Sequence, residues 1–199
     1  MKPAAEFQQV TRSLTFWQSY DPTVKVDLSC CARELEGGLV FIDPIPLAPE
    51  ALDELTAIAR PAAIVLTNGN HGRAAAAYRA RFNIPVFAHC DAVRELGFGV
   101  DQVVEEGDKV LNGLEVIELP GAGAGEIALH HGTALHFGDA VVHLQPLGLS
   151  ILPDKYCSDA KALRPALSKL LRFDLEILTF AHGLPLATLA HRRLAELVS

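Results

Sequence analysis

The chain has 199 residues, of which 50% are hydrophobic and 21% are charged, so it can bury one substantial core in a single domain of residues 1–199. Its 17 basic and 24 acidic residues give a formal net charge of −7, which argues against nucleic acid or an anionic membrane as a partner. No signal-peptide core and no apolar run of about 18 residues is present, so we expect a cytoplasmic protein without a membrane segment.

The first half of the chain is expected to alternate strands and helices. A proline at the first turn (Pro49), early acidic residues and a terminal Arg60 favour a helix, because they complement the helix dipole. Pro44 ends a strand, and Trp17 is expected in the core. The predicted strands are residues 7–20, 24–34, 39–43, 64–67 and 84–88, and the predicted helices are residues 50–60 and 74–82.

The second half reads as an antiparallel meander followed by helices. Ser158 is a suitable N-cap for a helix over 158–171. Strands are predicted at residues 101–106, 110–111, 114–119, 126–131, 134–137, 140–144 and 177–180, with a closing helix at 186–198. Strands and outer helices in both halves indicate an α+β fold with two stacked sheets between helices.

Polar side chains crowd the end of the buried strand at 64–67. Asn68, Asn70, His71 and Arg73 lie between this strand and the following helix, where free backbone N–H groups and the helix dipole favour an anion. The loop therefore predicts a site for a small anionic ligand. The alternative is purely structural: Asn70 caps the helix, and Asn68 and Gly69 make the turn.

Five landmarks in order resemble the metallo-β-lactamase fold superfamily over nearly the whole chain. They are Ile42-Asp43-Pro44, Leu66-Thr67, Leu119-Pro120-Gly121, Phe137-Gly138-Asp139-Ala140 and Ala181-His182-Gly183. The resemblance implies a four-layer αββα sandwich. It also implies a site for one or two metal ions at the sheet edge, used in the family to hydrolyse esters, thioesters, lactams or phosphodiesters.

Most of the ligand positions of that family are altered here. The family's T-H-x-H-x-D-H loop falls on Thr67-Asn68-Gly69-Asn70-His71-Gly72-Arg73, and its P-G-H motif falls on Pro120-Gly121-Ala122. Asp139 matches the bridging aspartate and His182 the terminal histidine, whereas His71 occupies a non-ligand position. Zinc prefers imidazole, thiolate or carboxylate donors, and a guanidinium repels a dication. We therefore expect no binuclear centre and no metal cofactor.

The surviving carboxylate then needs a positive partner. We predict that the guanidinium of Arg73 fills the former metal cavity and pairs with Asp139, because buried charges persist only when paired. The alternative is that Arg73 points to solvent from the first turn of its helix.

Two further functions stay open from the residues. A mononuclear hydrolase could use His71, Asp139 and His182 as ligands of one zinc, iron or manganese ion, with water as the fourth ligand. A structural role is also open, since the apolar stretch 144–152 could form a homodimer surface or be covered by the helix that follows Ser158.

The other histidines and the cysteines are given no functional role. His130 and His131 face opposite sides of one strand. His136 and His143 flank Asp139 at three and four residues, but helical spacing does not apply on a segment predicted as strand, turn and strand. Most of the four cysteines are expected as small buried hydrophobes.

Overall fold

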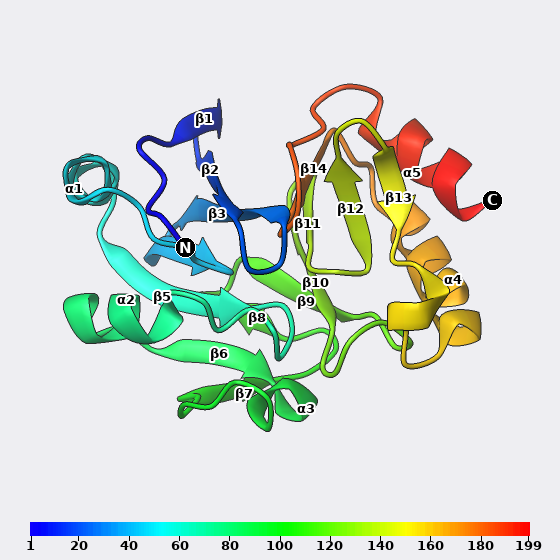
Figure 1. Cartoon of the computed structure of the whole chain (residues 1–199), viewed down its shortest axis with the longest axis horizontal. Helices are drawn as coiled ribbons and strands as arrows, with labels where there is room; N and C mark the ends of the chain where they lie inside the picture. Colours follow the sequence, from blue (N-terminus) through cyan, green and yellow to red (C-terminus); the bar gives the residue numbers. More distant parts are fainter.

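The computed structural model describes all residues from Met1 to Ser199, and Figure 1 shows two sheets stacked between two sets of helices. The first sheet has seven strands in the order β1-β2-β3-β4-β5-β6-β7, and the second has five in the order β14-β11-β10-β9-β8. Strands β12 and β13 form a separate hairpin. The predicted four-layer αββα sandwich is confirmed.

The elements of the first sheet come in chain order. They are β1 (Gln8–Thr11), β2 (Leu14–Asp21), β3 (Val26–Leu35), β4 (Gly38–Ile42), α1 (Pro49–Ile58), β5 (Pro61–Leu66), α2 (Ala75–Phe82), β6 (Val86–His89), α3 (Cys90–Val93) and β7 (Gln102–Val104). Strands β1 to β4 are antiparallel, and β4 to β7 are parallel.

The second half supplies the other sheet and its helices. The elements of this half, including the separate β12–β13 hairpin, are β8 (Lys109–Val110), β9 (Leu114–Glu118), β10 (Ile127–His131), β11 (Ala134–Phe137), β12 (Val141–Leu144), β13 (Gly148–Ile151), α4 (Ala160–Ser168), β14 (Ile177–Phe180) and α5 (Ala190–Val198). Two short 3-10 helices span Asp154–Tyr156 and Lys169–Arg172.

Side-chain alternation along β4 explains how the layers form. Leu39 and Phe41 pack into the core beneath α1 and α2, whereas Val40 and Ile42 pack between the two sheets. A strand covered on both faces is apolar throughout, as the run in β5 also shows. A third core packs α4 and α5 on the outer face of the second sheet. Trp17 is buried as predicted, and its indole donates to the Ile45 carbonyl at 3.1 Å.

Two strand predictions were wrong in detail. The segment predicted as one strand over 7–20 is a hairpin of β1 and β2, which pair antiparallel across a short turn. The segment over 101–106 does not begin the second meander, because β7 pairs parallel with β6 and closes the first sheet. Both errors concern strand pairing, which a local pattern of apolar residues does not specify.

The apolar stretch 144–152 forms most of the β12–β13 hairpin. Leu149, Ile151 and Leu152 are partly buried against the core of the second sheet, and Leu147 at the turn is 77% exposed. The strand β13 was not predicted from the sequence. None of the helices combines the length and apolar character that a membrane crossing requires.

The N-cap of α4 is Asp159 rather than the predicted Ser158. The Asp159 carboxylate accepts from the backbone N–H groups of Lys161 at 3.0 Å and Ala162 at 3.2 Å. Replacing Asp159 by alanine should therefore lower the free energy of unfolding by about 1 kcal/mol. Ser158→Ala should cost a few tenths at most, since Ser158 makes no capping bond. Urea unfolding of both variants checks this, and equal losses would contradict the assignment.

Candidate active site at the sheet edge

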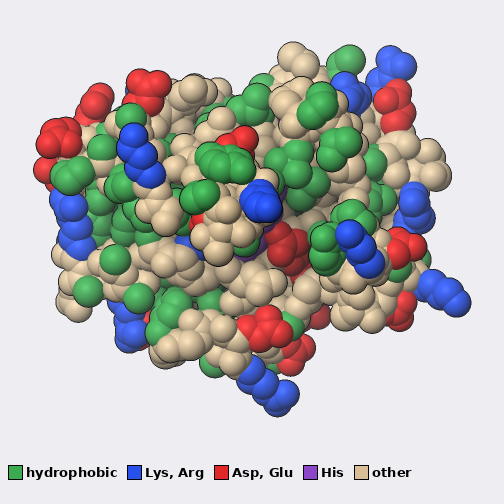
Figure 2. Space-filling view, in the orientation of Figure 1, with side chains coloured by type: hydrophobic (Ala, Val, Ile, Leu, Met, Phe, Trp, Pro, Cys, Tyr) green, Lys and Arg blue, Asp and Glu red, His purple; other side chains and the backbone are tan.

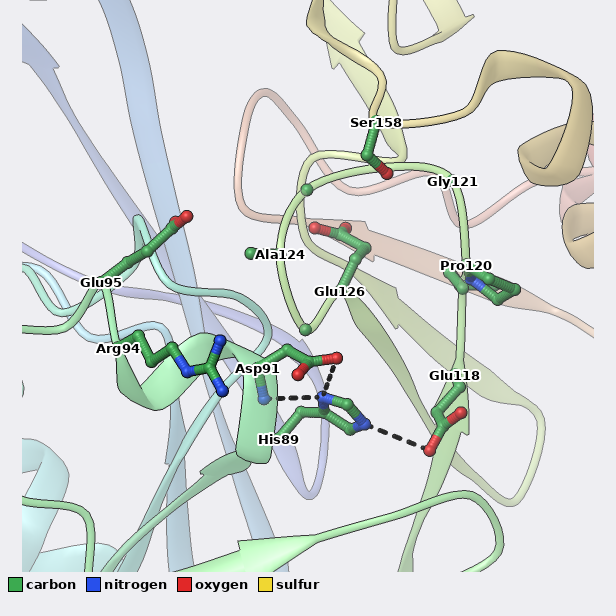
Figure 3. A pocket seen from close by; sticks show the side chains of 13 residues that line it. His89, Asp91, Arg94, Glu95, Glu118, Pro120, Gly121, Ala124, Glu126 and Ser158 are labelled. Carbon is green, nitrogen blue, oxygen red and sulfur yellow. Dashed lines mark hydrogen bonds and ion pairs between the residues drawn. The ribbon is translucent and has the colours of Figure 1, made fainter.

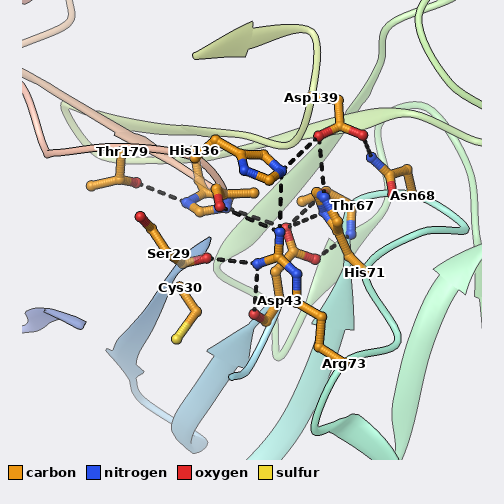
Figure 4. Close-up of polar contacts among 12 residues, drawn as sticks. Ser29, Cys30, Asp43, Thr67, Asn68, His71, Arg73, His136, Asp139 and Thr179 are labelled. Carbon is orange, nitrogen blue, oxygen red and sulfur yellow. Dashed lines mark hydrogen bonds and ion pairs between the residues drawn. The ribbon is translucent and has the colours of Figure 1, made fainter. Parts of the chain in front are cut away.

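The polar centre lies where strand ends of the two sheets meet. Asp43 follows β4, the Thr67 to Arg73 loop follows β5, Asp139 follows β11 and His182 follows β14. Strands β4 and β5 run parallel, as do β11 and β14, so their carboxyl ends lie at common edges. Figure 4 shows the side chains of these segments pointing toward one another.

Asp43 is the fully buried anchor of this centre. Its carboxylate accepts from the Thr67 backbone N–H at 2.8 Å, from the Thr67 hydroxyl and from His71 Nδ1 at 2.9 Å. Burial by itself would raise the pKa of Asp43, but the charge of His71 and hydrogen bonds from His136 and His71 hold it well below its usual range. Asp43 therefore stays ionised and fixes the orientation of the His71 ring.

His71 and His182 converge on one carboxylate oxygen. His71 Nε2 lies 3.3 Å and His182 Nε2 lies 3.1 Å from Asp139 Oδ1. Burial and Arg73 lower the pKa of His71, but the charges of Asp43 and Asp139 outweigh them and raise it to about 9. Burial lowers the pKa of His182 despite its contact with Asp139. At neutral pH the centre thus holds an imidazolium at position 71 and a neutral ring at position 182.

Arg73 reaches into the same centre instead of pointing to solvent. Its guanidinium donates to the backbone carbonyl oxygens of Ser29 at 2.8 Å, Ala181 at 3.3 Å and Asp43 at 3.4 Å. It also lies 3.3 Å from His182 Nε2. A planar guanidinium with several donors suits this arrangement of carbonyl groups.

The predicted ion pair between Arg73 and Asp139 is wrong. No nitrogen of Arg73 lies within 4.0 Å of a carboxylate oxygen of Asp139. The nearest positive group to Asp139 is His71, whose position on the loop places its ring between Asp43 and Asp139. The guanidinium does lie in the centre, but the backbone carbonyl groups of Ser29 in β3 and Ala181 after β14 hold it.

Asn68 joins a second buried carboxyl group to the centre. Its amide nitrogen donates to Glu126 Oε2 at 2.8 Å and to Asp139 Oδ2 at 3.0 Å. The other oxygen of Glu126 accepts from the Ala140 backbone N–H at 2.9 Å. Burial and the charge of Asp139 raise the pKa of Glu126 to about 8. The environments of Glu126 and Asp139 therefore favour opposite protonation states.

The remaining predicted site residue, Asn70, stays outside this network. Its side chain is exposed, and its backbone N–H donates to Asn68 Oδ1 at 2.9 Å. It does not cap α2, whose N-cap is Ala74 without a side-chain bond. The backbone N–H groups of Gly69, His71 and Ala74 also have partners within the protein. Few loop donors are therefore free for an anion.

Sequence reasoning missed Asp43, Thr67, Glu126 and His136 as members of the centre. His136 is buried, with Nδ1 2.9 Å from the Thr179 hydroxyl and Nε2 3.5 Å from Asp43 Oδ2. The alternation of side chains along β11 could have placed His136 on the buried face. Glu126 gave no local signal, because a single glutamate before a strand is ordinarily exposed.

The residues do not fit the binuclear metal centre that the landmarks imply. Asn68 is bonded to two carboxyl groups, Asn70 is exposed, and Arg73 places a cation beside His182. One smaller donor set does exist. The ligand atoms of His71, Asp139 and His182 lie within 4.8 Å of one another, and His71 Nε2 is buried without a hydrogen-bond partner.

The sequence from residue 9 to 199 matches the profile of the metallo-beta-lactamase superfamily. The chain belongs to this superfamily, which confirms the resemblance seen in the sequence. No curated protein matches it in sequence.

Solved structures share the fold at low sequence identity. DIM-1 metallo-beta-lactamase exposed to ceftazidime is 14% identical with a TM-score of 0.78, covering 98% of this chain and 97% of that one. A metallo-beta-lactamase from Pontibacter korlensis is 18% identical with a TM-score of 0.74, covering 97% and 98%. FIM-1 from Pseudomonas aeruginosa in the mono-zinc form is 15% identical with a TM-score of 0.74, covering 99% and 95%.

Proposed function

We propose that this protein binds a small molecule beside a metal-free centre and does not act as a binuclear hydrolase. The observation that carries the proposal is the partly buried Arg73 guanidinium, held by three carbonyl oxygens and 3.3 Å from His182 Nε2. A metal ion coordinated by that nitrogen would lie next to a permanent positive charge.

The charges of the centre support a state without an ion. Two carboxylates with lowered pKa values, Asp43 and Asp139, are matched by the guanidinium of Arg73 and by His71, whose pKa is raised to about 9. Glu126, with a pKa of about 8, is mostly neutral at pH 7. A buried group of charges is stable when it is paired and hydrogen-bonded, and this group is balanced by its own residues.

Metal content tests the proposal directly. Protein purified without chelator, incubated with zinc and then desalted, should retain far less than one equivalent of zinc, iron or manganese by elemental analysis. It should also hydrolyse chromogenic lactam and ester substrates no faster than Asp139→Asn. One equivalent of metal that is lost in both Asp139→Ala and His182→Ala would overturn the proposal.

A single-ion hydrolase is the second candidate. Donor atoms around a tetrahedral zinc ion with bonds of 2.0 to 2.1 Å lie about 3.3 Å apart. His71 Nε2 and His182 Nε2 lie at comparable distances of 3.3 and 3.1 Å from Asp139 Oδ1. Asp43 would orient His71 as the carboxylate behind a ligand histidine does. The mono-zinc form of FIM-1 is a relative with one ion in this fold.

In this second candidate the ion would activate water for hydrolysis, and the protein's residues would hold and orient it. Its donor set requires His71 to lose its proton and Arg73 to move away from His182.

The cytoplasmic location, the homodimer and the lack of a nucleic-acid partner stay predictions from the sequence.

A further inference from the structure

A cavity of about 480 Å³ adjoins the polar centre and shares Glu126 with it. One wall is the segment from His89 to Glu95 around α3, and the other is the segment from Glu118 to Glu126, next to which Ser158 lies (Figure 3). The volume is in the range of small-molecule sites. This inference rests on the proposed function, because it names the class of ligand that the protein would bind there.

Two glycines allow the walls to approach each other. A Cβ atom at Gly125 would lie 2.5 Å from the Ala92 backbone nitrogen, and one at Gly69 would lie 2.7 Å from the Glu95 carboxylate. Real Cβ contacts are not this short, so both positions depend on the missing side chain. The α3 segment is thus packed firmly against both the Thr67 to Arg73 loop and the loop before β10, which gives the cavity a defined shape.

The charges that line the cavity are mainly negative. Asp91, Glu95 and Glu118 contribute the negative charges, and Arg94 is the only lysine or arginine in the lining. Glu126 adds a fourth carboxyl group, which is mostly protonated at pH 7. A hollow of this sign raises the local concentration of cations and repels anions. Figure 2 shows acidic side chains within the hollow between the two halves of the molecule.

Glu126 is the buried carboxyl group without a positive partner. It is 3% exposed, and both of its oxygens accept only from neutral N–H groups, those of Asn68 and Ala140. No lysine, arginine or histidine nitrogen lies within 4.0 Å of it, whereas Asp139 has His71 and His182 at that range. An incoming ammonium group would supply the missing partner and donate to oxygens that can accept further hydrogen bonds.

Glu118 extends the negative lining. Its carboxylate lies 3.2 Å from His89 Nε2 and accepts from the Glu106 backbone N–H at 3.1 Å, so its position in the wall is fixed. The Glu118 carboxylate can therefore attract a second positive group at the far end of a longer ligand.

We propose that the cavity binds a small organic amine as its ammonium ion, and that Glu126 releases its proton to solvent when the ammonium group pairs with it. The sequence predicted an anionic ligand at the neighbouring loop, and the two classes of ligand are distinguished by charge. Three four-carbon probes of matched length separate them: 1,4-diaminobutane, 1,4-butanediol and succinate.

Isothermal titration calorimetry of the full chain with each probe tests the proposal. The diamine should bind, with an affinity that falls as salt is added, whereas the diol and succinate should bind at least tenfold more weakly. Glu126→Gln should weaken diamine binding tenfold or more, and Glu54→Gln on the exposed face of α1 should leave it unchanged. Asp91→Asn at the exposed wall should weaken diamine binding about threefold. Because Asp91 lies outside the buried network, this variant should fold as the wild-type protein does.

Binding of succinate in preference to the diamine would overturn the amine assignment, as would the absence of diamine binding at about 10 mM. Diamine binding that Glu126→Gln and Asp91→Asn leave unchanged would also overturn it. Results of this kind would contradict amine binding but not the proposed metal-free centre, because the metal content is measured separately. Stoichiometric metal would instead reject the proposed function whichever probe binds.

Discussion

Arg73→Met is expected to lower the free energy of unfolding by about 3 to 5 kcal/mol, because it removes one partner from a buried group of charges. The substitution leaves Asp43 and Asp139 with His71 as their only nearby charged partner of opposite sign. It also leaves the carbonyl oxygens of Ser29 and Ala181 without the donors that the guanidinium supplies. Urea unfolding followed by the fluorescence of Trp17, the single tryptophan, measures the loss.

Arg81→Met, on the helix α2 that follows the Arg73 loop, is the matched control. Arg81 forms an exposed ion pair with Asp53, and its loss should cost at most about 1 kcal/mol. Arg73→Lys should fall between the two, because a single ammonium nitrogen cannot replace the two guanidinium nitrogens that donate to three carbonyl oxygens. Equal stability of Arg73→Met and Arg81→Met would show that the Arg73 guanidinium does not hold the centre together.

The wild-type protein is expected to lose stability as the pH rises from about 6.5 to 9. The pKa of His71 is raised from 6.5 to about 9, so its favourable contribution is complete below pH 6.5 and is lost as pH rises through 9. A shift of this size corresponds to about 3 kcal/mol. Glu126 also lowers stability as the pH rises. Its pKa is raised from 4.5 to about 8, so the folded protein favours the protonated form that the unfolded chain loses first.

The two aspartates do not oppose this trend. Their pKa values are lowered, so their contribution is present above the unfolded value near 4 and is lost only in acid. His71→Gln should therefore be less stable than wild type at pH 6.5, with a much smaller difference at pH 9. Unfolding free energies at four pH values check this. A difference that stays constant across the range would mean that His71 is not protonated in the folded protein.

Two neighbouring carboxyl groups of the centre differ in their charged surroundings. Asp139 and Glu126 share the amide of Asn68, but only Asp139 has imidazole neighbours. Asn68 thus links a charged carboxylate to a neutral acid.

Local patterns in the sequence determined most elements and the fold family. The apolar runs of β4 and β5 and the landmarks around Asp43, Thr67, Asp139 and His182 sufficed, because strand burial and helix propensity act over a few residues. They also placed Asn68, His71 and Arg73 at one strand end. The same patterns could not separate β1 from β2 or assign β7 to its sheet, since pairing depends on distant strands.

Only the tertiary structure decided how the polar groups are paired. The sequence brought Arg73 and Asp139 to the same centre, but backbone carbonyl groups of Ser29 within β3 and of Asp43 and Ala181 at strand ends hold the guanidinium. His71 reaches Asp139 instead. Backbone groups carry no sequence signal, so their competition for a donor is invisible before folding. The side chains of Asp43, Glu126 and His136 likewise joined the site only when the two sheets packed together, because their partners come from segments far apart in the sequence.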